Sequence, residues 1–283
     1  MSKLGLKLLG ASALLGAGYL YLIAPRLKRK DTPSRVPFRA SYAHRGLHGV
    51  GVPENSLAAF AGAVKQGFGI ELDLQLSRDG QVMVFHDYNL ERMTGRNALL
   101  TDLDAEELRT LRLRDTEEKI PFLWEVLQLV DGKVPLLIEL KGESAKDMRL
   151  CEAAERVLRT YSGTWCVESF NPIQLAWWKK HRPDVVRGQL VTNLIRKKDG
   201  ALSKNPVDYL LTTMALNVCS RPDFISADGR MKNPSVEICR KVFGSDYFVW
   251  TIKGDAQRKE FLKSESYPIF EFLPEDFPKE SES

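Results

Sequence analysis

Hydrophobic and polar positions along the chain form two kinds of segment that follow one another. Short runs rich in Val, Ile, Leu and Phe indicate strands, and segments with apolar residues three and four positions apart indicate helices. Nine strands are predicted, at residues 39–43, 70–76, 82–85, 136–141, 164–167, 185–190, 224–226, 247–251 and 268–272. Helices are predicted at 56–66, 121–130, 145–161, 172–181, 206–214, 234–243 and 255–263. Strands that alternate with helices over about 250 residues are typical of a parallel sheet.

One pair of strands breaks the alternation. Residues 70–76 and 82–85 are joined by a link that begins Ser77-Arg78-Asp79-Gly80. Because parallel strands need a crossover of about a dozen residues, this pair must form an antiparallel hairpin. Without the returning strand eight strands remain, so the predicted fold is an α/β protein of the (β/α)8 TIM-barrel class. Residues 87–119 are predicted to be a small insertion after the hairpin, with a short helix near 105–111.

The N-terminus carries a long apolar run. Residues 8–24 hold 17 consecutive uncharged residues, which as a helix would span roughly 26 Å, close to the thickness of a bilayer core. The sequence therefore predicts an uncleaved single-pass transmembrane helix, with a cleaved signal peptide or a buried core helix as alternatives. Five basic residues follow the run at 26–35, which favours placing the rest of the chain on the cytoplasmic side of the membrane.

These features divide the chain into four parts. Residues 1–30 are predicted to be a membrane anchor with its basic flank, 31–38 a linker, 39–272 the barrel and 273–283 an acidic tail. Of the 283 residues, the first 30 hold six basic side chains and no acid, which leaves 35 Lys and Arg against 37 Asp and Glu in the body. That balance argues against a nucleic-acid partner. The four cysteines form no CxxC pair, so we expect buried free thiols and no zinc site.

Charged residues gather near the predicted ends of neighbouring barrel strands. Glu71 and Asp73 share one face of their strand, and Glu139 and Lys141 repeat this pattern on the next barrel strand. Inward carboxylates in a barrel are costly unless they bind something. His44 and Arg45 follow the first strand. A two-residue hairpin turn would place His86 opposite either Glu71 or Asp73, so we expect it to join the same rim.

This set of side chains suits phosphate-ester cleavage. Three carboxylates without Cys favour a hard divalent cation, Mg²⁺ or Ca²⁺. Such a cation beside Arg45 and Lys141 would neutralise a phosphodiester, and His44 and His86 could serve as general acid and base. The sequence has no GxSxG elbow, no P-loop and no GxGxxG after a strand, which disfavours the Ser hydrolase, P-loop and dinucleotide-binding classes.

Ten short motifs in order carry a family resemblance: Ala43-His44-Arg45-Gly46, Pro53-Glu54-Asn55-Ser56, Glu71-Leu72-Asp73, Asp79-Gly80, His86-Asp87, Leu90-Glu91-Arg92-Met93-Thr94-Gly95, Ile120-Pro121, Ile138-Glu139-Leu140-Lys141, Ser169-Phe170-Asn171 and Trp250-Thr251. Over residues 39–272 the chain resembles the glycerophosphodiester phosphodiesterase family, whose members share a TIM barrel with a small insertion.

The resemblance implies a role for each site residue. Glu71, Asp73 and Glu139 would hold the cation, His44 and His86 would be the acid/base pair, and Arg45 and Lys141 would contact the phosphate. Trp250 would wall the glycerol pocket, with ordinary barrel packing as the alternative, and Asn55 would order the first loop. Two positions depart from the family pattern, because Lys253 replaces a usual Asn, and Phe270-Glu271-Phe272 replaces a usual Thr-Asp. His48 and His181 match no motif and are expected in a loop and on a helix surface.

The expected activity is cation-dependent hydrolysis of glycerophosphodiesters to glycerol 3-phosphate and an alcohol by a membrane-tethered phosphodiesterase. A tether would make lysophospholipids plausible substrates, as in a lysophospholipase D. Two further alternatives remain open. One is a lyase in which a substrate hydroxyl attacks phosphorus and a cyclic phosphate is released, and the other is a non-catalytic module that binds phospholipid.

Overall fold

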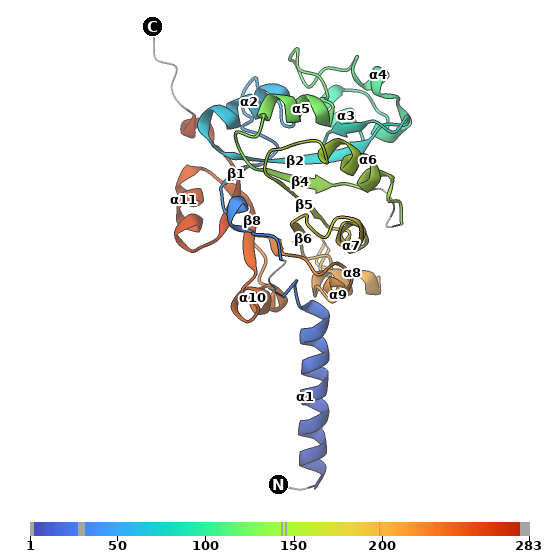
Figure 1. The fold of residues 1–283 in the computed structure, drawn as a ribbon, viewed down its shortest axis with the longest axis vertical. Coiled ribbons are helices and arrows are strands. Elements are labelled where there is room, and N and C mark those ends of the chain that lie inside the picture. The colour runs from blue at the N-terminus through green and yellow to red at the C-terminus, as the bar shows by residue number, and fades with distance from the viewer. Residues whose placement is uncertain (1–2, 28–31, 143, 145, 198, 278–283) are drawn as a thin grey trace.

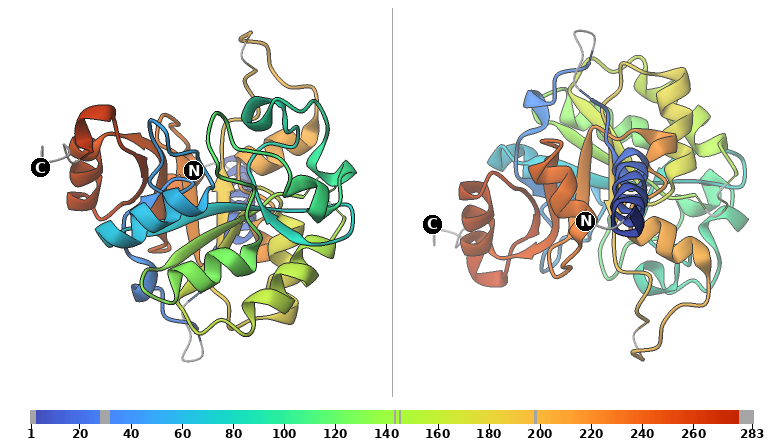
Figure 2. Two further views of the ribbon diagram at one scale, coloured as in Figure 1. Left: turned by 90° about the horizontal axis from the view of Figure 1, so that it is seen from above. Right: turned by 90° about the horizontal axis from the view of Figure 1, so that it is seen from below.

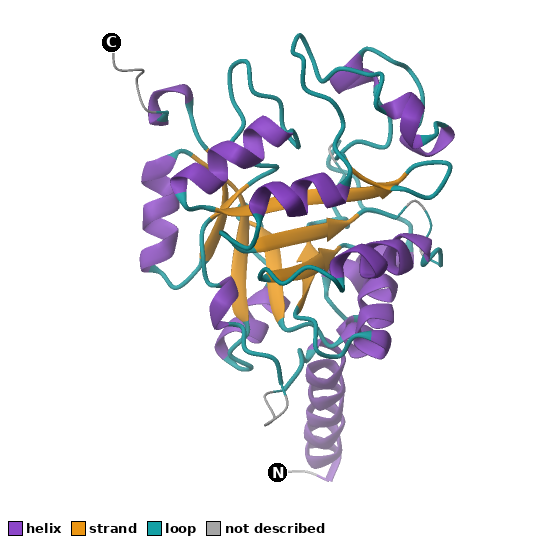
Figure 3. Cartoon of the chain, turned by 45° about the horizontal axis from the view of Figure 1, so that its top comes forward, coloured by secondary structure: helices purple, strands orange, loops and turns teal. Residues whose placement is uncertain are grey.

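Eight parallel strands form a closed barrel with helices around it (Figures 1 and 3). The computed structural model describes residues 3–27, 32–142, 144, 146–197 and 199–277. The barrel strands are β1 (Tyr42–Ala43), β2 (Gly69–Leu76), β4 (Leu136–Leu140), β5 (Trp165–Ser169), β6 (Arg187–Val191), β7 (Phe224–Asp228), β8 (Asp246–Lys253) and β9 (Tyr267–Glu271). The barrel closes because β1 pairs with both β2 and β9. The prediction of a TIM barrel is confirmed.

Seven of the outer helices in the described residues lie within the predicted helical segments, and the short helix α9 was not predicted. They are α2 (Leu57–Gln66), α5 (Leu123–Val130), α6 (Arg149–Leu158), α7 (Pro172–His181), α8 (Pro206–Thr212), α9 (Asn217–Ser220), α10 (Pro234–Lys241) and α11 (Asp255–Lys263). Three of them begin in the same way. Asn171, Asn205 and Asn233 each accept a hydrogen bond from the backbone N–H two residues later, and Pro follows at the first helical position.

The hairpin register differs from both registers predicted. Strand β3 (Val82–Val84) pairs with β2 so that Leu74 lies opposite Val84. The turn holds three residues, and its last, Gly80, has a φ of 82°, a conformation that favours glycine. His86 therefore lies opposite neither Glu71 nor Asp73. It follows the end of β3 and still reaches the cavity that Glu71 lines.

The insertion after the hairpin has a small core of its own. It contains α3 (Glu91–Thr94), the 3-10 turn η2 (Leu100–Asp102) and α4 (Ala105–Leu108). Leu90, Met93 and Leu108 pack with Met83 and Phe85 of the hairpin. Two further 3-10 turns, η1 (Val36–Phe38) and η3 (Pro274–Asp276), lie before β1 and after β9.

The interior of the barrel is closed below the site by large side chains. Tyr42, Leu137, Phe224 and Phe248 pack together there and are almost fully buried. Gly188 on β6 is required for this packing, because a Cβ at that position would lie 2.0 Å from the Phe224 ring. The polar residues of the site therefore lie next to a layer of buried apolar side chains.

The predicted transmembrane anchor is wrong. Helix α1 (Lys3–Ile23) extends away from the barrel (Figures 1 and 2), yet no helix in the described part of the chain is long and apolar enough to cross a bilayer. Its last turn docks on the body, since Ile23 is fully buried beside Ile225 and Val236, and the Tyr19 hydroxyl lies 2.6 Å from Ser235 Oγ. The end of the apolar run therefore packs against the body. The membrane location, the cytoplasmic side and the membrane partner rested on this span and are withdrawn with it.

Candidate active site

Three carboxylates from two adjacent strands converge inside the barrel. Glu71 and Asp73 project from β2 and Glu139 from β4, and one oxygen of each lies within 4.8 Å of the others. Asp73 and Glu139 are register partners. Burial and mutual repulsion raise the pKa of Glu71 well above its ordinary value and that of Glu139 to about 7. Burial also opposes ionisation of Asp73, but Lys141, His86 and Arg45 hold its pKa below the ordinary range.

A lysine ammonium, a backbone N–H and a side-chain amide fix these carboxylates. The Lys141 ammonium lies 2.7 Å from Glu139 Oε1 and 3.2 Å from Asp73 Oδ1. The backbone N–H of Arg45 donates to Glu71 at 3.0 Å, and the Asn55 amide donates to Asp73 at 2.8 Å. Asn55 was expected only to order the first loop. It also positions one of the predicted cation ligands.

Glu54 positions the Arg45 side chain. Its carboxylate accepts from Arg45 at 2.6 Å and from Arg92 of α3 at 2.7 Å. Burial alone would raise the pKa of Glu54, but hydrogen bonds from Arg92 and the charge of Arg45 lower it to about 2. Sequence reasoning gave Glu54 no role, although it stands in the motif Pro53-Glu54-Asn55-Ser56.

Each of the two predicted acid/base histidines bonds to a carboxylate. His44 Nδ1 lies 2.8 Å from Glu271 Oε1, and its Nε2 faces Glu71 Oε2 at 4.0 Å. His86 Nδ1 lies 2.6 Å from Asp87 Oδ1. Burial lowers the pKa of both imidazoles, and the carboxylate partners oppose that shift. Each ring is therefore oriented by its carboxylate partner.

A small cavity of about 110 Å³ lies among these groups. His44, Arg45, Glu71, His86, Glu139, Lys141, Glu168 and Trp250 are among the residues that line it. The structure thus brings seven of the eight predicted site residues and one unpredicted acid to one cavity. The eighth, Asp73, lies against Arg45 and Lys141. Trp250 lines the cavity and also packs edge-on against Phe170. Its position agrees both with a wall of the substrate pocket and with ordinary barrel packing.

Glu168 is a second residue that sequence reasoning missed. It is the β5 register partner of Glu139, so Asp73, Glu139 and Glu168 form one row across three strands. It is 1% exposed, and burial with the charge of Glu139 raises its pKa well above the ordinary value. The nearby Ser226 hydroxyl opposes this rise in the pKa of Glu168. Within the described residues, however, Glu168 Oε2, Ser226 Oγ and Trp250 Nε1 make no hydrogen bond of ordinary geometry, so these buried polar atoms could bind polar groups of a ligand.

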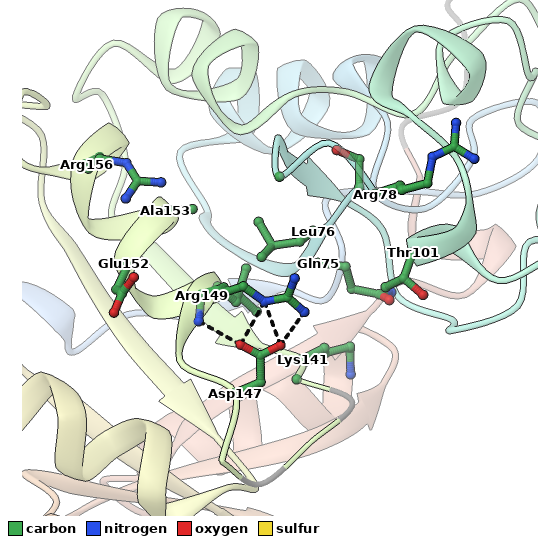
Figure 4. Close-up of a pocket in the computed structure, with 14 residues that line it drawn as sticks. Gln75, Leu76, Arg78, Thr101, Lys141, Asp147, Arg149, Glu152, Ala153 and Arg156 are labelled. Atoms are coloured by element: carbon green, nitrogen blue, oxygen red, sulfur yellow. Dashed lines mark hydrogen bonds and ion pairs between the residues drawn. The ribbon is translucent and has the colours of Figure 1, made fainter.

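A wider groove of about 370 Å³ adjoins the cavity and shares Lys141 with it (Figure 4). Arg78 from the hairpin and Arg149 and Arg156 from α6 line it. Asp147 binds Arg149 through both carboxylate oxygens, as the dashed lines show. The groove is therefore polar and rich in arginine.

The charged side chains gather at one rim of the barrel, which is where enzymes with this fold place their active sites. The model of the glycerophosphoryl diester phosphodiesterase family matches residues 44–265. The chain belongs to that family, which confirms the resemblance and the prediction of a phosphoric diester hydrolase at the level of family membership.

Individual relatives agree with this assignment. A glycerophosphodiester phosphodiesterase of Caldanaerobacter subterraneus subsp. tengcongensis is 34% identical over 158 residues, or 52% of this chain and 65% of that protein. One from Bacillus altitudinis is 34% identical over 176 residues, or 58% of this chain and 71% of that protein. Across four curated bacterial relatives the matched segments span 45% to 72% of the relative's length.

Solved structures share the fold. An Oleispira antarctica phosphodiesterase, in complex with its product sn-glycerol-3-phosphate, superposes with a TM-score of 0.66 at 23% identity. The alignment covers 82% of this chain and 92% of that chain.

Proposed function

We propose that this chain hydrolyses glycerophosphodiesters to glycerol 3-phosphate and an alcohol, with a divalent cation held by Glu71, Asp73 and Glu139. The observation that carries the proposal is the cluster of three buried carboxylates beside two oriented imidazoles. Buried acids whose pKa is raised by mutual repulsion gain stability from a cation between them. Because the donors are all oxygen, the set fits Mg²⁺ or Ca²⁺. When bound, the cation would supply positive charge to the phosphodiester.

Side chains of this chain would bind the phosphate and transfer the protons. Arg45, held by Glu54, and Lys141 would bind the non-bridging phosphate oxygens. One imidazole of the pair His44 and His86, neutral at the start, would take a proton from the attacking water. The other, protonated at the start, would give its proton to the departing alkoxide. Glu271 and Asp87 would keep these rings in place through the transfer.

The size of the cavity bears on the substrate. About 110 Å³ is small compared with the roughly 300 to 1,000 Å³ of pockets for drug-sized ligands. The unpaired atoms of Glu168, Ser226 and Trp250 favour a group that carries hydroxyls. A free glyceryl group therefore fits the inner cavity, and the alcohol of the diester would leave toward the groove lined by Arg78, Arg149 and Arg156.

A substrate panel tests this proposal. The full chain would be assayed with glycerophosphocholine, glycerophosphoserine and lysophosphatidylcholine, with and without a chelator, and the products identified by phosphorus NMR. We expect glycerol 3-phosphate from the first two substrates and loss of activity with the chelator. A cyclic phosphate product would show the lyase alternative instead, and preference for the lysolipid would show a lysophospholipase D.

A further inference from the structure

A second group of metal-ligating side chains lies beside the catalytic cavity. His44 and His48 follow β1, and Glu271 ends β9, the strand next to β1. One ligand atom from each of the three lies within 4.8 Å of the others. His44 connects this group to the carboxylate cluster. Its Nδ1 lies 2.8 Å from Glu271 Oε1, and its Nε2 faces Glu71 Oε2 at 4.0 Å.

The donor set differs in kind from that of the carboxylates. Two imidazole nitrogens and one carboxylate oxygen suit Zn²⁺ and neighbouring transition metals, whereas an all-oxygen set suits Mg²⁺ or Ca²⁺. Bonds of about 2.1 Å to Zn²⁺ place tetrahedral ligand atoms about 3.4 Å apart. Separations of at most 4.8 Å can reach that geometry by small side-chain rotations.

The loop that carries His48 is ordered by its own hydrogen bonds. The backbone N–H of Leu47 donates to Ala59 of α2, and Gly49 and Val52 bond to each other in both directions. Gly46 lets the loop lie against α2, since a Cβ there would lie 2.8 Å from that of Ala59. His48 is therefore held near Glu271. His44 and Glu271 are 15% and 21% exposed, so a cation can reach them from solvent.

We propose that His44, His48 and Glu271 form an inhibitory site for a borderline divalent cation such as Zn²⁺. A cation on Nδ1 of His44 would displace the hydrogen bond with Glu271 and would leave the imidazole a weaker base. Lys253 contacts the same carboxylate and opposes binding, so occupancy should need added cation rather than a trace amount. The inhibition rests on the proposed role of His44 in catalysis. The binding of the cation does not.

His48 allows a clean test, because it takes no part in the proposed chemistry. Zn²⁺ would be titrated into the full chain at saturating Mg²⁺ during glycerophosphocholine hydrolysis, for wild type, His48→Gln and the matched surface control His181→Gln. His48→Phe serves as a second variant should the first fail to fold. We expect His48→Gln to keep the wild-type rate without Zn²⁺ and to need at least about tenfold more Zn²⁺ for half-inhibition, while His181→Gln matches wild type.

Direct binding separates this inference from the proposed function. Visible absorption of Co²⁺ at saturating Mg²⁺ should show a low-symmetry site in wild type and in His181→Gln but not in His48→Gln. Equal Zn²⁺ sensitivity of wild type and His48→Gln, inhibition that excess Mg²⁺ relieves, or identical Co²⁺ spectra would each overturn the site. A wild-type chain that hydrolyses no glycerophosphodiester would contradict the proposed function, and the Co²⁺ spectra would still decide whether the site exists.

Discussion

His44 Nδ1 lies 2.8 Å from Glu271 Oε1, and the Lys253 ammonium contacts the other oxygen of the same carboxylate. These acidic and basic residues stand at the two positions where the chain departs from the family pattern. The structure links these two departures to each other and to the orientation of His44.

We expect Glu271→Gln to lower kcat about tenfold or more, the order of effect of outer-shell partners of functional imidazoles. The hydrogen bond with Glu271 raises the pKa of His44 against the effect of burial. Its loss should therefore move the limb of the pH profile that belongs to His44 to lower pH. The pH dependence of kcat measures this shift, with the exposed Glu275→Gln as control. A lower rate with an unmoved limb would contradict the positioning role.

His44→Ala and His86→Ala should each lower kcat by about 10² to 10⁴, the usual contribution of a general acid or base. The double variant should lose less than the product of the two single effects, because both groups serve one proton-transfer scheme. His181→Ala on the surface of α7 is the control. If His86→Ala kept both limbs of a bell-shaped profile and the wild-type rate, His86 would be a structural residue.

Glu54 should make stability depend on pH at the acid end. Its pKa in the folded chain is about 2, below its ordinary value of 4.5. The resulting stabilisation is fully present above pH 4.5, is lost as pH falls toward 2, and amounts to at most about 3 kcal/mol. Glu54→Gln should remove this dependence in urea unfolding curves measured from pH 6 to pH 3. Glu117, 86% exposed and paired with Arg112, provides the control, since Glu117→Gln should change little.

The unpaired carboxyl oxygen of Glu168 predicts a role in substrate selection. Glu168→Leu should raise KM for glycerophosphocholine about tenfold to a hundredfold, because a hydroxyl of the substrate would lose its buried partner. Glu168→Gln keeps a hydrogen-bonding group and should lose much less. The comparison substrate is bis(4-nitrophenyl) phosphate, which has no hydroxyls. A similar rise in KM for both substrates would assign Glu168 to the support of the carboxylate cluster rather than to the glyceryl group.

The barrel fold and the approximate residue ranges of its strands could be predicted from hydrophobic periodicity and from the lengths of the connections. All nine strands appear close to their predicted ranges, and the short link after β2 required a hairpin. The register of that hairpin could not be predicted, because a two-residue and a three-residue turn fit the same Ser77–Gly80 segment. The structure shows the three-residue form, with Gly80 in a left-handed conformation.

Two errors share a physical cause. The apolar run of α1 satisfied a length criterion for a membrane span, but periodicity cannot show that its last turn is buried against β7 and α10. Likewise Glu168 is the one charged residue of β5, and only the pairing of β4 with β5 places it beside Glu139. Both features depend on contacts between segments far apart in the chain, and a local sequence pattern cannot predict such contacts.

The most direct test of the account is the rate of glycerol 3-phosphate formation from glycerophosphocholine as a function of free Mg²⁺ or Ca²⁺. Wild type should be inactive in chelator and should recover with a saturable dependence on the cation. Glu139→Ala should need far more cation for the same rate, because it lacks one of three charged ligands. Full activity of wild type or of Glu139→Ala in excess chelator would contradict a cation site at Glu71, Asp73 and Glu139.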